Sequence, residues 1–78
     1  YIEDANLKDA NLAGADLTGA NLTQTNFTGA FLEGVNLKNA DLTDAVMTDT
    51  NLGGVKNLNT AILCRTTMPD ASINNSGC

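Results

Sequence analysis

The chain contains no histidine and no tryptophan, and its aromatic residues are one tyrosine and two phenylalanines. Without histidine, neither a Ser-His-Asp nor a Cys-His catalytic arrangement can form, and two cysteines alone cannot close a zinc site. The sequence also lacks a glycine-rich phosphate loop with its lysine and lacks the ligand pattern of a calcium loop. We therefore expect no catalytic residue, no cofactor and no metal ion, and a protein that is not an enzyme.

Basic residues and long apolar runs are also scarce. Four lysines and arginines stand against nine acidic residues, which gives a net charge of −5 over 78 residues. A surface of that sign argues against direct binding of nucleic acid, whose phosphates attract basic side chains. No apolar run approaches the ~20 residues that span a bilayer, so we expect no membrane insertion.

What the chain does contain is a repeat of five residues. Large apolar residues recur at an unbroken spacing of five, at Ile2, Leu7, Leu12, Leu17, Leu22, Phe27, Leu32, Leu37, Leu42, Met47 and Leu52. A small residue, most often alanine, stands two positions before most of these centres, with Asn or Asp usually between them. Two positions after each centre, ten of eleven residues are Gly, Asn or Asp, with Gln24 as the exception. These are the residues that accept left-handed backbone most easily, so we expect a turn in every unit.

A period of five predicts a backbone that bends once per unit. On an α-helix, five steps rotate a side chain by about 140°, which would spread the leucines around the cylinder. In a straight strand, an odd spacing would send successive leucines to opposite faces. A corner in every unit resolves both conflicts and lets each alanine and leucine point inward together. Three corners per coil and four corners both remain open, but Phe27 and Met47 are 20 residues apart and favour four.

The units resemble those of the pentapeptide repeat family. Ala5-Asn6-Leu7-Lys8-Asp9 and Ala40-Asp41-Leu42-Thr43-Asp44 are similar to its A-(D/N)-L-x-x unit, and the resemblance runs from residue 1 to about residue 54. It implies an all-β fold, a right-handed quadrilateral parallel β-helix (a solenoid) with four five-residue faces per coil and nearly four coils in this chain. The departures from the pattern are the hydroxyls of Thr25 and Thr50 at inward positions, and the apolar Phe31 and Val46 at outward ones.

After Gly54 the repeat slips by one residue. Large apolar residues resume at Leu58, Leu63, Met68 and Ile73. We expect one inserted residue near positions 53–57, in the form of a bulge at a corner. This divides the single domain into a solenoid over residues 1–54 and a register-shifted last coil with a capping tail over residues 55–78. Residues 59–78 either continue the coil or leave it to form a separate cap.

The two cysteines, Cys64 and Cys78, stand at the ends of the tail. A disulfide between them would contribute roughly 3 kcal/mol by the chain-entropy argument, and we favour it over two free thiols in a reducing compartment. The tail from Cys64 to Asp70 also resembles the C-terminal segment of cyanobacterial and chloroplast-lumen members of the family. Together these points favour the thylakoid lumen or the periplasm, with the cytoplasm as the alternative.

For function, the sequence favours a non-enzymatic structural or protein-interaction module with an unidentified protein partner. The alternative, implied by the resemblance, is an acidic DNA mimic that inhibits a topoisomerase such as gyrase. Tyr1, Phe31 and Val46 occupy outward positions. They are either scattered surface residues that need no explanation or a contact surface for the partner, with Phe31 as its anchor. Self-association, end to end or edge to edge, is a further option because a solenoid has two exposed ends.

Overall fold

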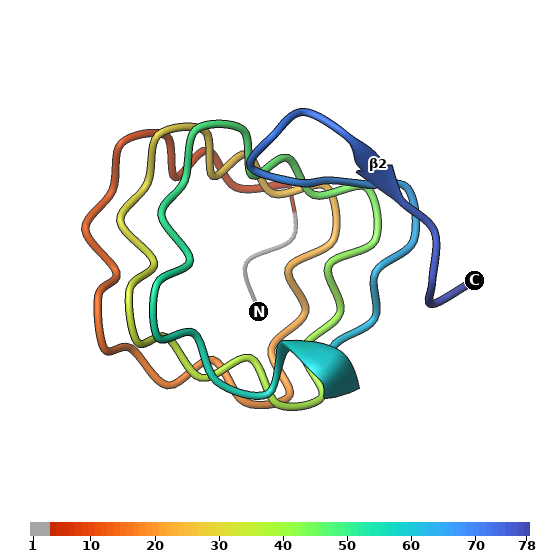
Figure 1. Ribbon diagram of the computed structural model, residues 1–78, viewed down its shortest axis with the longest axis horizontal. Helices are drawn as coiled ribbons and strands as arrows, with labels where there is room; N and C mark the ends of the chain where they lie inside the picture. Colours follow the sequence, from red (N-terminus) through yellow and green to blue (C-terminus); the bar gives the residue numbers. More distant parts are fainter. Residues whose placement is uncertain (1–3) are drawn as a thin grey trace.

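The computed structural model describes residues 4–78 as a stack of coils in which the chain repeatedly returns beside itself (Figure 1). Parallel bridges join residues exactly one coil apart, at Asn6↔Asn26, Asn11↔Phe31, Asp16↔Asn36, Asn21↔Asp41, Asn26↔Val46, Phe31↔Asn51 and Asn36↔Lys56. Each of these pairs is separated by 20 residues, and successive bridges are five residues apart. The predicted parallel β architecture is therefore confirmed, with hydrogen bonds running from each coil to the next.

Every unit turns through a residue with left-handed backbone. From Asp4 to Gly54, the residue two positions after each apolar centre has a φ between 58° and 74°. Gln24 adopts the same conformation with a φ of 60°, although its side chain has no special preference for it. The turn is closed by a backbone bond such as Ala10 N–H to Leu7 O at 3.0 Å. The prediction of a corner in each unit is confirmed.

The Asn or Asp that stands before most of the centres fixes the same turn from outside. Its Oδ1 accepts the backbone N–H two residues later, as in Asn26 with Thr28 at 3.0 Å and Asp41 with Thr43 at 3.0 Å. Where that later residue is threonine, its hydroxyl also donates to the same oxygen, at 2.6 Å in both units. We call this position, one before each apolar centre, the Asx position.

The core lies along the axis of the coils. The side chains of Leu22, Phe27, Leu32, Leu37, Leu42 and Met47 are buried, as are those of Ala30, Val35, Ala40 and Ala45, which point inward beside them. Thr25 and Thr50 are buried at the inward positions that the sequence gives them. The hydroxyl of Thr50 donates to the carbonyl oxygen of Met47 at 2.8 Å, so this buried polar group is paired. By contrast, Leu7, Leu12 and Leu17 of the first coil are only partly buried.

The slip in the repeat lies between Lys56 and Ile62. The next two bridges, Asp41↔Ile62 and Val46↔Thr67, join residues 21 apart, whereas Asn36↔Lys56 still joins residues 20 apart. A 3-10 helix, η1, covers Leu58–Thr60 and follows Asn57, whose φ is 62°. The expected insertion of one residue is confirmed by the change in separation from 20 to 21, and it begins at Asn57, the end of the expected window. The expected bulge is wrong. A three-residue helical turn takes up the extra residue at the corner instead.

The coil ends at Pro69, and a short hairpin follows it. Asp49 N–H donates to Pro69 O at 3.3 Å, which is still a coil-to-coil bond. The chain then reverses, and strand β2 (Ile73–Asn74) pairs antiparallel with strand β1 (Thr66–Thr67). Ile73 is 57% exposed and does not continue the inward series, because the chain has already changed direction. The tail thus begins as coil and ends as a cap over the rim of the last coil (Figure 1). No helix among residues 4–78 has the length and hydropathy to cross a membrane.

Candidate functional site

The described residues offer little that could bind a small ligand. Residues 4–78 enclose no pocket. Nowhere in this range do three His, Cys, Asp or Glu side chains gather closely enough to hold a metal ion. The features left for a function are the outer wall of the coils and the rim that the tail covers.

The tail is fastened to the rim by a disulfide between Cys64 and Cys78, whose Cα atoms are 5.2 Å apart. The two halves differ in exposure: Cys64 is 5% exposed and belongs to the core side, whereas Cys78 lies on the surface. Gly77 N–H donates to Leu63 O at 2.8 Å, which lays the tail against the backbone of the last coil. A Cβ at Gly77 would lie 2.7 Å from Leu63 N, so only glycine allows this approach.

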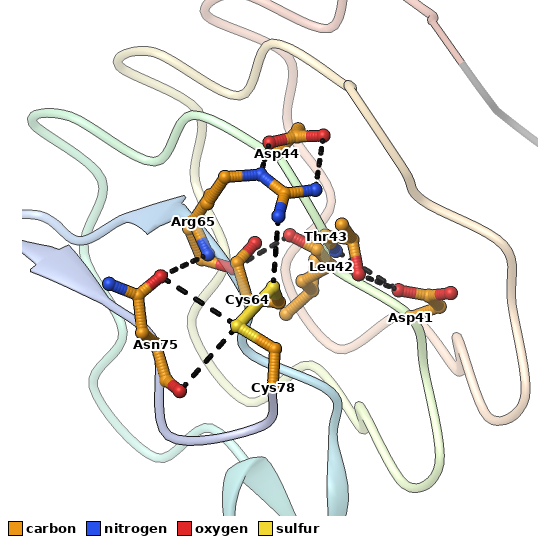
Figure 2. A network of polar contacts seen from close by, with 9 residues as sticks. Asp41, Leu42, Thr43, Asp44, Cys64, Arg65, Asn75 and Cys78 are labelled. Carbon is orange, nitrogen blue, oxygen red and sulfur yellow. Dashed lines mark hydrogen bonds and ion pairs between the residues drawn. A yellow bond between two sulfur atoms is a disulfide. The ribbon is translucent and has the colours of Figure 1, made fainter.

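Arg65 lies at the centre of a polar network beside the disulfide (Figure 2). Its Nε and Nη2 donate to the two carboxylate oxygens of Asp44, at 2.8 and 3.2 Å. Its Nη1 lies 3.5 Å from Cys64 Sγ. The ion pair lowers the pKa of Asp44 below its usual value, chiefly through the hydrogen bond from Arg65, and it raises the pKa of Arg65 for the same reason. A two-pronged contact of this kind fixes the guanidinium plane, so its charge is held next to the sulfur.

Two further hydrogen bonds connect this network to its surroundings. Arg65 N–H donates to Asn75 Oδ1 at 2.8 Å, which ties the tail to the coil from outside. From inside, the hydroxyl of buried Thr66 donates to Leu42 O, one coil below, at 2.7 Å. The start of β1 is therefore held on both sides, by the core and by the tail.

The Asp44–Arg65 pair is not among the residues that the five-residue repeat singles out. These residues are 21 apart, so they become neighbours on adjacent coils only once the inserted residue is counted. The signal in the sequence is an acidic and a basic residue 21 positions apart, which is one coil plus the inserted residue.

The outward apolar residues do not form one surface. Phe31 is 51% exposed and pairs with Asn11 and Asn51. Val46 is only partly exposed, and it pairs with Asn26 and Thr67 in a different column of bridges. Tyr1 lies outside the described residues. The structure therefore leaves Phe31 as a single projecting side chain on its column, with Val46 on another.

Phe31 and Val46 also interrupt the series of side-chain bonds at the Asx position. Asn or Asp at that position accepts the backbone N–H two residues on, as Asn11 does from Ala13 at 3.2 Å and Asn51 does from Gly53 at 2.9 Å. A hydrocarbon side chain has no acceptor, so the units that contain Phe31 and Val46 lack this bond. Both units still keep their turn, because their backbone bonds and left-handed residues are unchanged.

Comparison with protein families identifies the repeat. The family model described as pentapeptide repeats, in eight copies, matches residues 5–44 and 20–56. The chain belongs to the pentapeptide repeat family. Pentapeptide repeats fold as a right-handed β-helix and are generally non-enzymatic structural modules.

Two solved pentapeptide repeat proteins illustrate the relationship. HetL, a protein involved in the regulation of heterocyst differentiation in the cyanobacterium Nostoc sp. strain PCC 7120, is 33% identical over 92% of this chain, with a TM-score of 0.49. The protein alr5209 from Nostoc PCC 7120 is 31% identical over 76% of this chain, with a TM-score of 0.32. The chain spans 35% of the length of HetL and 60% of that of alr5209. No curated protein matches the chain.

Proposed function

We propose that this pentapeptide repeat chain is a non-enzymatic protein-interaction module that uses its outer wall, with Phe31 as the anchor of the contact. The scaffold in this proposal is a four-sided β-helix of nearly four coils. Bridges every five residues between positions 20 apart support that count, because four five-residue faces then complete one coil. A rigid wall of this kind offers fixed positions for side chains that meet a partner.

The observation that carries the proposal is the break at the Asx position. Asn and Asp recur at this position along the coils, and their side chains fasten the turn. Phe31 gives up that bond and exposes 51% of its surface instead. A residue that breaks a local rule without a gain inside the fold is best explained by a contact outside it.

Phe31→Asn is the sharpest test, because it restores the residue type that the position otherwise carries. The variant should lose a partner that the unaltered chain captures from a lumenal or periplasmic extract. Its free energy of unfolding should stay unchanged or rise by about 0.5–1 kcal/mol, because the turn gains a side-chain bond. Retention of the same partner, identified by mass spectrometry, would remove Phe31 from the contact.

Asn51→Ala provides the matched control on the same column of bridges. It removes the Asx bond of Asn51 and leaves the Phe31 side chain in place. It should therefore lower the thermal midpoint slightly while capture of the partner is retained. If Asn51→Ala also abolished capture, the loss in Phe31→Asn could not be assigned to the aromatic side chain.

The dimensions of the molecule weigh against the DNA-mimic alternative. The principal extents are 28 × 22 × 21 Å, and one turn of a DNA duplex is about 34 Å long. The net charge of −5 is the feature that fits a mimic. A gyrase supercoiling assay with micromolar protein should therefore find no inhibition, and inhibition would favour the mimic over the interaction module.

For the compartment, we propose the thylakoid lumen or the periplasm. The cysteine pair joined at the rim supports an oxidising location. Fractionation of the native cells, with the protein detected by antibody, tests this directly: recovery in the cytoplasmic fraction would contradict it.

A further inference from the structure

The disulfide, rather than side-chain packing, is the main attachment of the tail, residues 70–78, to the last coil. Across residues 70–78 every side chain is exposed except that of Asn74, which is partly exposed, so no buried apolar group anchors the tail. Its other contacts with the coil are the two-residue pairing of β2 with β1, the bond from Met68 N–H to Ser72 O at 2.7 Å, the Gly77–Leu63 backbone bond and the Arg65–Asn75 bond. Few contacts of this kind, all near water, open easily once the covalent link is gone.

The two sulfur atoms are not equivalent toward an external thiol. Cys78 lies on the surface, whereas Cys64 is 5% exposed. In thiol–disulfide exchange, a thiolate attacks one sulfur, and the other sulfur leaves with the electron pair of the broken bond. Access therefore directs the attack to Cys78 Sγ and makes Cys64 the leaving group.

Arg65 is placed to assist that departure. Its Nη1 lies 3.5 Å from Cys64 Sγ, while Asp44 holds the rest of the guanidinium through both carboxylate oxygens (Figure 2). A cation beside a sulfur stabilises the thiolate and so speeds its loss. Burial alone would slow the same step, because it disfavours a charged sulfur.

We propose that the Cys64–Cys78 pair is an exchange site for an external dithiol, with Cys78 as the attacked sulfur and Arg65 as the residue that stabilises the leaving Cys64 thiolate. One thiolate of the reductant bonds to Cys78 Sγ as the protein disulfide breaks. The second thiol of the reductant then displaces Cys78. The reductant ends as a disulfide, and the protein gains two electrons and two protons. Residues 70–78 then leave the rim and expose the free edge of β1.

The position of attack can be read directly by peptide mapping. Glutathione, a monothiol, should form a mixed disulfide with the folded protein that can be trapped by acid. Trypsin cleaves after Lys56 and Arg65 and so separates Cys64, in peptide 57–65, from Cys78, in peptide 66–78. We expect the glutathione adduct on peptide 66–78. An adduct mainly on peptide 57–65 would overturn the assignment.

The role of Arg65 can be tested by the rate of reduction with dithiothreitol, followed by alkylation and intact mass. The disulfide of Arg65→Gln should be reduced roughly threefold to tenfold more slowly than that of the unaltered protein, because the charge next to the leaving sulfur is lost. Arg65→Lys should recover most of the rate, since it keeps a cation there. Lys56→Gln removes a charge elsewhere and should leave the rate unchanged. The charge effect would be excluded if Arg65→Gln and the unaltered protein were reduced at the same rate. It would also be excluded if Arg65→Lys were reduced as slowly as Arg65→Gln.

Release of the tail is tested by hydrogen exchange on the full chain. After reduction, the amide protons of Met68 and Gly77, which donate to Ser72 O and Leu63 O, should lose protection. Those of Leu22, Phe27 and Leu42, which donate to carbonyl oxygens of the neighbouring coil, should keep theirs. Cys78→Ser should reproduce the reduced pattern without reductant. Unchanged protection of Met68 and Gly77, or loss of protection throughout the coils, would overturn the proposal. Because this readout involves neither Phe31 nor a protein partner, its result is separate from that of the interaction test.

Discussion

At the scale of single residues, the turns explain why the repeat tolerates so few side-chain types two positions after each centre. All of these residues from Asp4 to Gly54 have left-handed backbone, which costs most side chains about 1 kcal/mol or more. Glycine avoids the cost, and Asn or Asp reduces it. Gln24 has neither advantage, and it is the one place where the pattern in the sequence and the conformation disagree.

Replacing Gln24 with glycine should therefore stabilise the protein. We expect Gln24→Gly to raise the free energy of unfolding by about 0.5–1 kcal/mol, since relief of the left-handed strain exceeds the added entropy of the unfolded chain. Ala13→Gly is the control, because position 13 does not have a positive φ and should lose stability. Urea unfolding of the three proteins measures both changes, and a less stable Gln24→Gly variant would contradict the argument.

The buried hydroxyl of Thr66 should also contribute measurably. Thr66→Val keeps the shape but loses the 2.7 Å bond to Leu42 O, whose remaining partner is Ala45 N–H at 3.0 Å. We expect a loss of about 1 kcal/mol in the free energy of unfolding. Thr48→Val, on the outer wall, should change it by less than about 0.5 kcal/mol. Equal effects in the two variants would mean that the bond to Leu42 contributes nothing.

At the scale of elements, burial is graded from the first coil to the middle ones. Leu42 is 0% exposed, whereas Leu12 in the first coil is only partly buried. Leu42→Ala should cost about 2–5 kcal/mol, and Leu12→Ala about half as much or less, because its cavity is open to solvent. Thermal unfolding followed by circular dichroism measures the difference. A larger loss for Leu12→Ala would mean that the ends, rather than the middle coils, carry the stability.

The sequence predicts the coils far better than it predicts their end. Inward, outward and turn positions follow from the five-residue spacing, because each unit repeats the same local chemistry. The slip after Gly54 was visible, but a bulge and a 3-10 helix both add one residue, so the sequence could not distinguish them. Ile73 keeps the spacing by accident: the hairpin depends on hydrogen bonds of β2 to β1, which leave no periodic signal.

At the scale of the whole molecule, the charge pattern predicts sensitivity to acid. Hydrogen bonds lower the pKa of three carboxyls: Asp16 chiefly through the hydroxyl of Thr18, Asp44 through Arg65, and Asp70 through the hydroxyl of Ser72. A folded-state pKa below the unfolded one adds stability that is complete above the unfolded value, about 3.9, and is lost as the pH falls through the folded value. The thermal midpoint should therefore hold between pH 7 and about pH 5 and drop below about pH 4.

Asp44→Asn is the variant that tests this dependence. It removes one of the three carboxyls and should make the fall in acid less steep, while the midpoint at pH 7 decreases slightly. A midpoint that rises as the pH is lowered through 4 would contradict the sign of the dependence. The candidate contact of Phe31 includes none of these three carboxyls.

The long separation between paired residues of neighbouring coils, 20 residues up to Asn36↔Lys56 and 21 after it, has a consequence for how the chain folds. Each coil can make its hydrogen bonds to the next only after the chain has closed a loop of that length, which costs conformational entropy. The first closure brings only two coils together, and the small core that they bury offsets only part of this cost. Every later coil adds onto a template that is already in place, at a similar loop cost. Folding should therefore begin slowly, extend rapidly in both directions from the middle, and reach the two end coils last.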